Sequence, residues 1–101
     1  MGGRHNYMTE ATYTKDQIRA EIKRLIANVT EREPGEISDT AHFMDELGVD
    51  SLMAMEVMIA VDKKFKIDIP EEEFNKATNV DESVAMVERW IAARNGNVMT
   101  A

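Results

Sequence analysis

The chain has 101 residues, which is enough for one folded domain and too few for two. Its 19 acidic side chains outnumber the 12 basic ones, and the net charge of −7 argues against binding to nucleic acid or to an anionic membrane surface. Because the sequence contains no cysteine, disulfides, thiolate metal sites and thiol nucleophiles are excluded, and a reducing compartment suits the chain.

The two ends of the chain have the composition of loose tails. Residues 1–12 are predicted to be a disordered tail or a remnant of expression, and residues 95–101 a loose C-terminal end, which leaves 13–94 for the domain. The first residues lack the apolar segment of a signal peptide, and no run approaches the roughly 18 apolar residues of a membrane span. We therefore expect a cytoplasmic protein.

A first helix is predicted to begin after Thr14 and to run to about Thr30. Thr14 and Gln17 have the spacing of a capping box, in which each side chain satisfies a free N–H group near the helix start. The apolar residues that follow recur every three to four positions and form one stripe, which is typical of a helix packed on a core. They are Ile18, Ile22, Leu25, Ile26 and Val29.

A long and mostly acidic connection follows over residues 31–50. It begins with a turn at Pro34, which the glycine after it favours. Ile37, Phe43 and Leu47 are spaced along the connection and can hold it against a core. A connection of this length that carries its own apolar anchors is often functional.

The second long helix is predicted over about 51–65. Gly48 can supply a positive φ ahead of it, and either Asp50 or Ser51 can cap its start. One face should pack on the core, because it carries Ala54, Val57, Met58, Val61 and Phe65. The opposite face carries Leu52, Met55, Glu56, Ile59 and Lys63, flanked by Met53 and Ala60. A contiguous apolar row on a face that should meet water is a candidate partner surface.

The remaining chain is predicted to contain an extended segment over 66–70, a single short helical turn over 71–74 and a final helix over about 80–94. Asn79 and Glu82 have the spacing of a second capping box at the start of that helix. No stretch shows the alternation of a strand. The predicted fold is therefore all-α, a small four-helix bundle of three longer helices and one short one.

The residues offer little support for catalysis by the chain itself. His5 and His42 are the only histidines, and nothing in the spacing brings His42 together with Ser51 and a carboxylate. Neither a calcium-binding loop nor a glycine-rich phosphate loop is present. We therefore predict no catalytic residue and no metal site.

Ser51 has a simple interpretation and a functional one. By itself it is a helix cap, because serine is preferred there. However, its hydroxyl also lies where free N–H groups and the helix dipole favour an attached anion. It stands beside the predicted apolar row, and four acidic residues surround it, namely Asp45, Glu46, Asp50 and Glu56.

The segment Gly48-Val49-Asp50-Ser51-Leu52 resembles the attachment motif of the acyl carrier proteins. The resemblance extends over about residues 14–93, because Leu47, Glu56, Phe65 and the segment Ile69-Pro70-Glu71-Glu72 follow the family's order and spacing. It implies that Ser51 receives 4′-phosphopantetheine from coenzyme A through a separate phosphopantetheinyl transferase, with Asp50 assisting the transfer. The thiol of that arm would hold acyl groups as thioesters, which a chain without cysteine could not do alone.

The resemblance also implies surfaces for partners and for cargo. The carrier would be a monomer. Its partners would be the transferase and biosynthetic enzymes, such as synthases and acyltransferases, that have basic or apolar docking surfaces. They would contact the carrier at Leu52, Met53, Met55, Glu56, Ile59, Asp45 and Glu46. Val57, Met58, Val61 and Ile69 would line a cavity that shelters the acyl chain, or would pack as ordinary core.

The recognition helix departs from that of fatty-acid carriers in its charge. Met53 stands where those carriers usually have an acid, and Lys63, Lys64 and Lys66 stand where they carry acids near the end of the helix. Basic partner surfaces would be steered less strongly by such a helix. A polyketide or specialised-lipid pathway is therefore a candidate beside fatty-acid biosynthesis.

Two alternatives to an acyl carrier follow from the same residues. An aminoacyl or peptidyl carrier would use Ser51 with a different cargo. A cofactor-free interaction module would instead use Met53, Met55 and Met58 as adaptable contacts, and Ser51 would only cap its helix.

Overall fold

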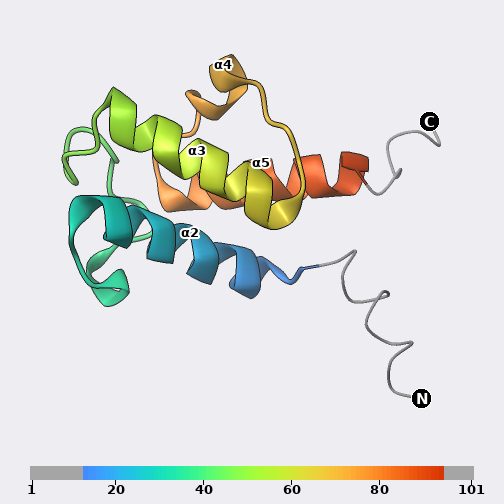
Figure 1. Cartoon of the computed structure of the whole chain (residues 1–101). Coiled ribbons are helices and arrows are strands. Elements are labelled where there is room, and N and C mark those ends of the chain that lie inside the picture. The colour runs from blue at the N-terminus through green and yellow to red at the C-terminus, as the bar shows by residue number, and fades with distance from the viewer. Residues whose placement is uncertain (1–12, 95–101) are drawn as a thin grey trace.

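The structure, a computed structural model, describes residues 13–94. The tails predicted at 1–12 and 95–101 lie outside the described residues. The elements are α2 (Lys15–Thr30), the 3-10 turn η1 (Pro34–Glu36), α3 (Ser51–Phe65), α4 (Glu71–Phe74) and α5 (Val80–Arg94). The described part of the chain contains three long helices, one short helix and no strand (Figure 1). The predicted all-α bundle is therefore confirmed.

The core lies between the three long helices. α2 packs against both α3 and α5, and α4 lies beyond α3 at the edge of the bundle (Figure 1). Ile18, Ile22, Leu25 and Ile26 are buried as the helical stripe predicted, and Val29 is half-buried at its end. The three predicted anchors of the long connection are buried as well, so the connection is packed on the bundle rather than extended into solvent. None of the helices between residues 13 and 94 is long and apolar enough to cross a membrane.

The caps follow the prediction at α2 and depart from it at α5. At α2 the Thr14 Oγ1 accepts from Gln17 N at 3.0 Å, and Gln17 Oε1 accepts from Thr14 N at 2.8 Å. At α5 Asn79 Oδ1 accepts from Glu82 N at 2.8 Å, but the Glu82 carboxylate accepts from Thr78 N and Oγ1. The predicted reciprocal box is therefore wrong in its second half, because Thr78 offers two donors. These bonds lower the pKa of Glu82.

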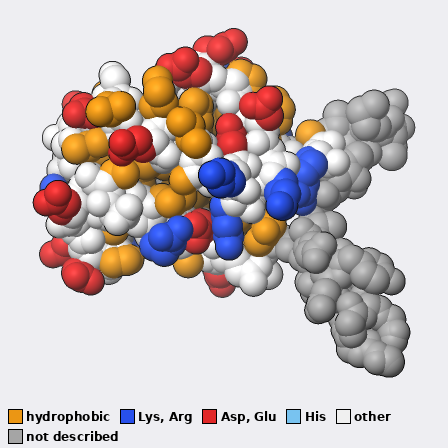
Figure 2. All heavy atoms as spheres, viewed as in Figure 1, with side chains coloured by type: hydrophobic (Ala, Val, Ile, Leu, Met, Phe, Trp, Pro, Cys, Tyr) orange, Lys and Arg blue, Asp and Glu red, His pale blue; other side chains and the backbone are white. Residues whose placement is uncertain are grey.

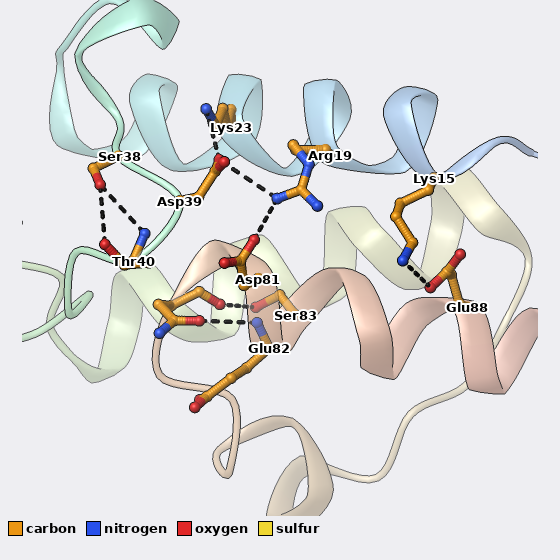
Figure 3. Close-up of polar contacts among 11 residues, drawn as sticks. Lys15, Arg19, Lys23, Ser38, Asp39, Thr40, Asp81, Glu82, Ser83 and Glu88 are labelled. Atoms are coloured by element: carbon orange, nitrogen blue, oxygen red, sulfur yellow. Dashed lines mark hydrogen bonds and ion pairs between the residues drawn. The ribbon is translucent and has the colours of Figure 1, made fainter.

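Charged side chains tie the long connection to the helices on either side of it (Figure 3). Asp39 lies 2.7 Å from Lys23 Nζ and 3.5 Å from Arg19 Nη1, and Arg19 also pairs with Asp81 at the start of α5. The hydrogen bond from Lys23 is the main cause of the lowered pKa of Asp39. These pairs are partly exposed, and ion pairs near the surface contribute about 0–1 kcal/mol each, so they orient the connection more than they stabilise it.

The carboxylate of Asp62 is placed unfavourably in the last turn of α3. Its Oδ1 accepts a hydrogen bond from Ile69 N at 3.2 Å. Burial raises its pKa, the charge of Asp68 raises it further, and the hydrogen bond from Ile69 opposes both effects. A raised pKa means that folding disfavours the ionised form. The destabilisation is therefore present at neutral pH, above the folded pKa, and disappears as acid protonates the group.

We expect Asp62→Asn to raise the free energy of unfolding at pH 7 by about 0.3–1 kcal/mol, because it removes a negative charge from a helix C-terminus and keeps an acceptor for Ile69 N. Urea titrations should show the gain shrinking towards pH 4. Asp16→Asn is the matched control, since Asp16 lies in the first turn of α2 and its loss should lower stability. Equal stability of Asp62→Asn and the unaltered protein at pH 7 would contradict the prediction.

Candidate functional site

The candidate site is the sharp turn that leads into α3. Gly48 adopts the positive φ predicted for it, 73°, which a side chain would disfavour. Val49 is buried, and its N–H donates to Phe43 O at 2.9 Å. The buried side chain of Val49 and its hydrogen bond to Phe43 hold the turn against the core, whereas Asp50 and Ser51 are exposed at the start of the helix.

Asp50, and not Ser51, caps α3. The Asp50 Oδ1 accepts a hydrogen bond from Met53 N at 2.9 Å, and Asp50 O accepts from Ala54 N at 2.9 Å. Ser51 is therefore the first residue of the helix itself. Within residues 13–94 its exposed hydroxyl takes part in no hydrogen bond. The interpretation of Ser51 as the cap is thus wrong, and its hydroxyl is free for chemistry.

The start of α3 suits a phosphate ester on the Ser51 oxygen. The backbone N–H groups of Ser51 and Leu52 belong to the first turn, where no intrahelical acceptor exists. Together with the positive end of the helix dipole they favour an anion at this place. The site therefore fits a phosphate-linked group attached to Ser51 Oγ, on the chemistry of its own atoms.

The acidic residues before α3 differ in whether their carboxylates are engaged in hydrogen bonds. Glu46 Oε2 accepts from His42 N at 3.0 Å, whereas the Asp45 side chain is largely exposed. His42 Nδ1 accepts from Asp45 N at 3.1 Å, so the imidazole belongs to this turn and makes no hydrogen bond to Ser51 within the described residues. In the same part of the chain, no group of three or more acidic or histidine side chains is placed to hold a metal ion.

An apolar row follows Ser51 along the outer face of α3. Leu52 is 66% exposed, Met55 43% and Ile59 54%, as the helical spacing predicted. Met44, 52% exposed, lies on the connection and shares a recess with Met55, a placement that the sequence analysis missed. In the sequence, only its position next to the predicted core anchor Phe43 indicates that Met44 lies close to the bundle.

Charge is unevenly distributed around this row. Figure 2 shows orange side chains mixed with red ones over much of this face, and blue ones gathered towards the end of α3. Lys63 and Lys64, in the last turn of α3, and Lys66, directly after it, are all exposed. Glu56 is exposed within the row, and Met53 is half-buried at its side. The surface therefore offers apolar contacts with acidic neighbours near Ser51 and basic ones at the far end.

Two hollows lie beside α3, and the predicted cavity residues are divided between them. An inner cavity of about 70 Å³ is lined by Val57 and Val61. An outer recess of about 180 Å³ is lined by Ser51 and Met58. Ile69 is buried but lines neither hollow.

Comparison with known proteins gives a consistent result. Residues 20–87 match the family model described as "Phosphopantetheine attachment site". The chain is 36% identical to an acyl carrier protein of Rickettsia bellii, across 68% of this chain and 80% of that one. It is 34% identical to one of Wolinella succinogenes, across 67% and 90%. A mitochondrial acyl carrier protein of Neurospora crassa is 32% identical across 72% of this chain, which spans 55% of that relative's length.

Proposed function

Because the chain belongs to the acyl carrier protein family, whose members bear covalent 4′-phosphopantetheine, we propose that Ser51 is the residue that receives this group. The observation that carries the proposal is the free hydroxyl at the first position of α3, exposed and relieved of the capping role by Asp50. The domain would then present acyl groups to biosynthetic enzymes.

Attachment uses the atoms at the start of α3. The Ser51 hydroxyl gives up its proton, and its Oγ forms an ester bond to the phosphorus of the phosphopantetheine unit while the pyrophosphate bond of coenzyme A breaks and adenosine 3′,5′-bisphosphate leaves. Asp50, the exposed residue directly before Ser51, would assist the metal-dependent transferase. The helix start stabilises the resulting phosphodiester anion.

After attachment, the domain displays the phosphopantetheine arm and is recognised by partner enzymes. When bound, the arm supplies the thiol on which acyl groups are carried as thioesters. The chain itself supplies no catalytic group in this proposal, and it works as a monomer in the cytoplasm. The similarity to acyl carrier proteins and the apolar lining of the inner cavity favour acyl cargo over aminoacyl cargo. Fatty-acid, polyketide and specialised-lipid enzymes are the candidate users.

The docking face in this proposal is the outer surface of α3 and the end of the connection. Leu52, Met55 and Ile59 provide apolar contacts, and Met53 supports them from the side. The acidic residues Asp45, Glu46 and Glu56 steer basic partner surfaces, since charge complementarity chiefly raises association rates.

Intact-mass spectrometry tests the proposal directly. Incubation with coenzyme A, Mg²⁺ and a broad-specificity phosphopantetheinyl transferase should add the mass of one phosphopantetheinyl group. Peptide mapping should locate that group at residue 51. An unchanged mass, in a sample whose circular dichroism shows a folded helical protein, would refute the proposal.

Glu56→Lys is expected to lower kcat/KM of the transferase for this chain by about three- to tenfold at low ionic strength, because it reverses a charge on the docking face. The defect should diminish as salt screens the interaction. The control is Asp16→Lys, which makes the same charge change in the first turn of α2. Equal effects of the two variants would show that only the net charge matters.

A further inference from the structure

The apolar row on the outer face of α3 ends in an unpaired lysine. Leu52, Ile59 and Lys63 are spaced by seven and by four residues, which places them within about 40° of one another around the helix. Lys63 is exposed, and its side chain makes no ion pair or hydrogen bond within residues 13–94. The row therefore carries a basic group that is available to whatever covers it.

Other lysines of the described chain are engaged with acids. Lys15, Lys23 and Lys76 pair with carboxylates at 3.9, 2.7 and 3.4 Å, respectively. Asp62, which precedes Lys63, is half-buried, and its Oδ1 accepts a hydrogen bond from Ile69 N. Asp62 is also turned by about 100° from Lys63 around the helix. The chain itself thus leaves the charge of Lys63 uncompensated on the row.

The opposite end of the row is acidic. Asp45 and Asp50 are exposed beside the start of α3. Ser51 and Lys63 are twelve residues apart on one helix, which separates them by about 18 Å along its axis. That separation exceeds the Debye length of about 8 Å at physiological ionic strength. The two ends therefore act as separate charges of opposite sign, with apolar side chains between them.

Two kinds of occupant have the charges to complement such a face. One is a second copy of this chain, turned end to end so that acids meet lysines. However, two chains that each carry a net charge of −7 repel one another. The other is an enzyme surface on which the order of the charges is inverted. The overall charge of the chain favours the enzyme.

We infer that the enzyme that uses this carrier covers α3 with a groove whose basic edge lies over the Ser51 end and whose acidic edge meets Lys63. The inference rests on the proposed function and adds the chemistry of the partner. Lys63 then acts as a specificity residue, because it attracts an acidic edge and repels a groove that is basic along its whole length.

Lysines in the last turn of a helix also interact favourably with the helix dipole, an effect that needs no partner. Lys64 separates the two roles. It is exposed in the same turn but lies about 100° further round the helix. The pKa of Glu21 on α2 is lowered chiefly by the hydrogen bond from Arg24 and further by the charge of Lys64, so Lys64 lies towards α2. Lys64→Glu is therefore the matched control for Lys63→Glu.

The test measures binding of the phosphopantetheine-bearing chain to two forms of one enzyme. The probe is a malonyl-coenzyme A acyltransferase chosen for a docking groove that is basic along its whole length. In its second form, the basic side chains of that groove farthest from the active-site entrance are replaced by glutamate. NMR titration of the labelled chain gives Kd for each pair, and circular dichroism verifies that each variant is folded.

We expect the unaltered chain to bind the glutamate form about three- to tenfold more tightly than the original enzyme at low ionic strength. Lys63→Glu should reverse this order, and Lys64→Glu should preserve it. Both preferences should diminish as salt screens the charges. The thermal midpoints of the two variants should change alike, since both lysines lie in the last turn.

The outcomes separate this inference from the proposed function. Equal effects of Lys63→Glu and Lys64→Glu on Kd, or no preference of the unaltered chain for the glutamate form, would overturn the inference and leave the carrier function standing. A dimer in sedimentation velocity that Lys63→Glu abolishes would assign the face to a second copy and overturn the enzyme partner. Failure of the chain to accept phosphopantetheine would overturn the proposed function and the inference with it.

Discussion

Ser51→Ala is expected to abolish the addition of phosphopantetheine completely while leaving the fold intact. The hydroxyl is the only group that the substitution removes, and no described hydrogen bond depends on it. The free energy of unfolding should therefore change by no more than about 0.5 kcal/mol. Intact mass after incubation with coenzyme A and the transferase, together with a urea titration, measures both effects.

Two further variants distinguish attachment from helix capping. Ser38→Ala removes another exposed serine hydroxyl, one near Thr40 on the connection, and should leave the mass gain unchanged. Asp50→Ala removes the cap of α3 and should cost about 1 kcal/mol of stability. If Ser51 were the cap, the stability effects at positions 50 and 51 would be reversed. A mass gain retained in Ser51→Ala would place the attachment elsewhere.

Phe65→Ala is expected to have the largest effect on stability, a loss of about 3–5 kcal/mol. The Phe65 ring is fully buried and meets the Tyr13 ring edge to face, with centroids 4.9 Å apart. Removing it leaves a cavity at the end of α3. Since a small domain has only about 5–15 kcal/mol of stability in total, the variant should be largely unfolded at moderate urea concentrations.

Ile59→Ala is the matched control, because it truncates an apolar side chain on the same helix that is 54% exposed. Its stability should change by about 0.5 kcal/mol or less, whereas its docking to partner enzymes should weaken. Similar losses for Phe65→Ala and Ile59→Ala would contradict the assignment of one face of α3 to the core and the other to partners.

The contrast between these two faces follows from the sequence of α3 alone. Val57, Val61 and Phe65 repeat at helical spacing and are buried, and Leu52 and Ile59 repeat on the opposite face and are exposed. The bounds of α2, α3 and α5 were predictable for the same reason. Helix period, the Thr14 cap and the positive φ at Gly48 depend on residues within a few positions of one another. The attachment motif is equally local.

The helices, their buried stripes and Ser51 as the candidate attachment residue could thus be predicted from the order of the amino acids. Three pairings could not be predicted in this way: Met44 and Phe74 line the same two hollows, Met58 and Val57 line different ones, and Arg19 pairs with Asp81. Each of these pairings depends on how separate segments pack. A helical repeat specifies which way a side chain faces, but the side chain that meets it from another segment depends on the packing of the whole bundle.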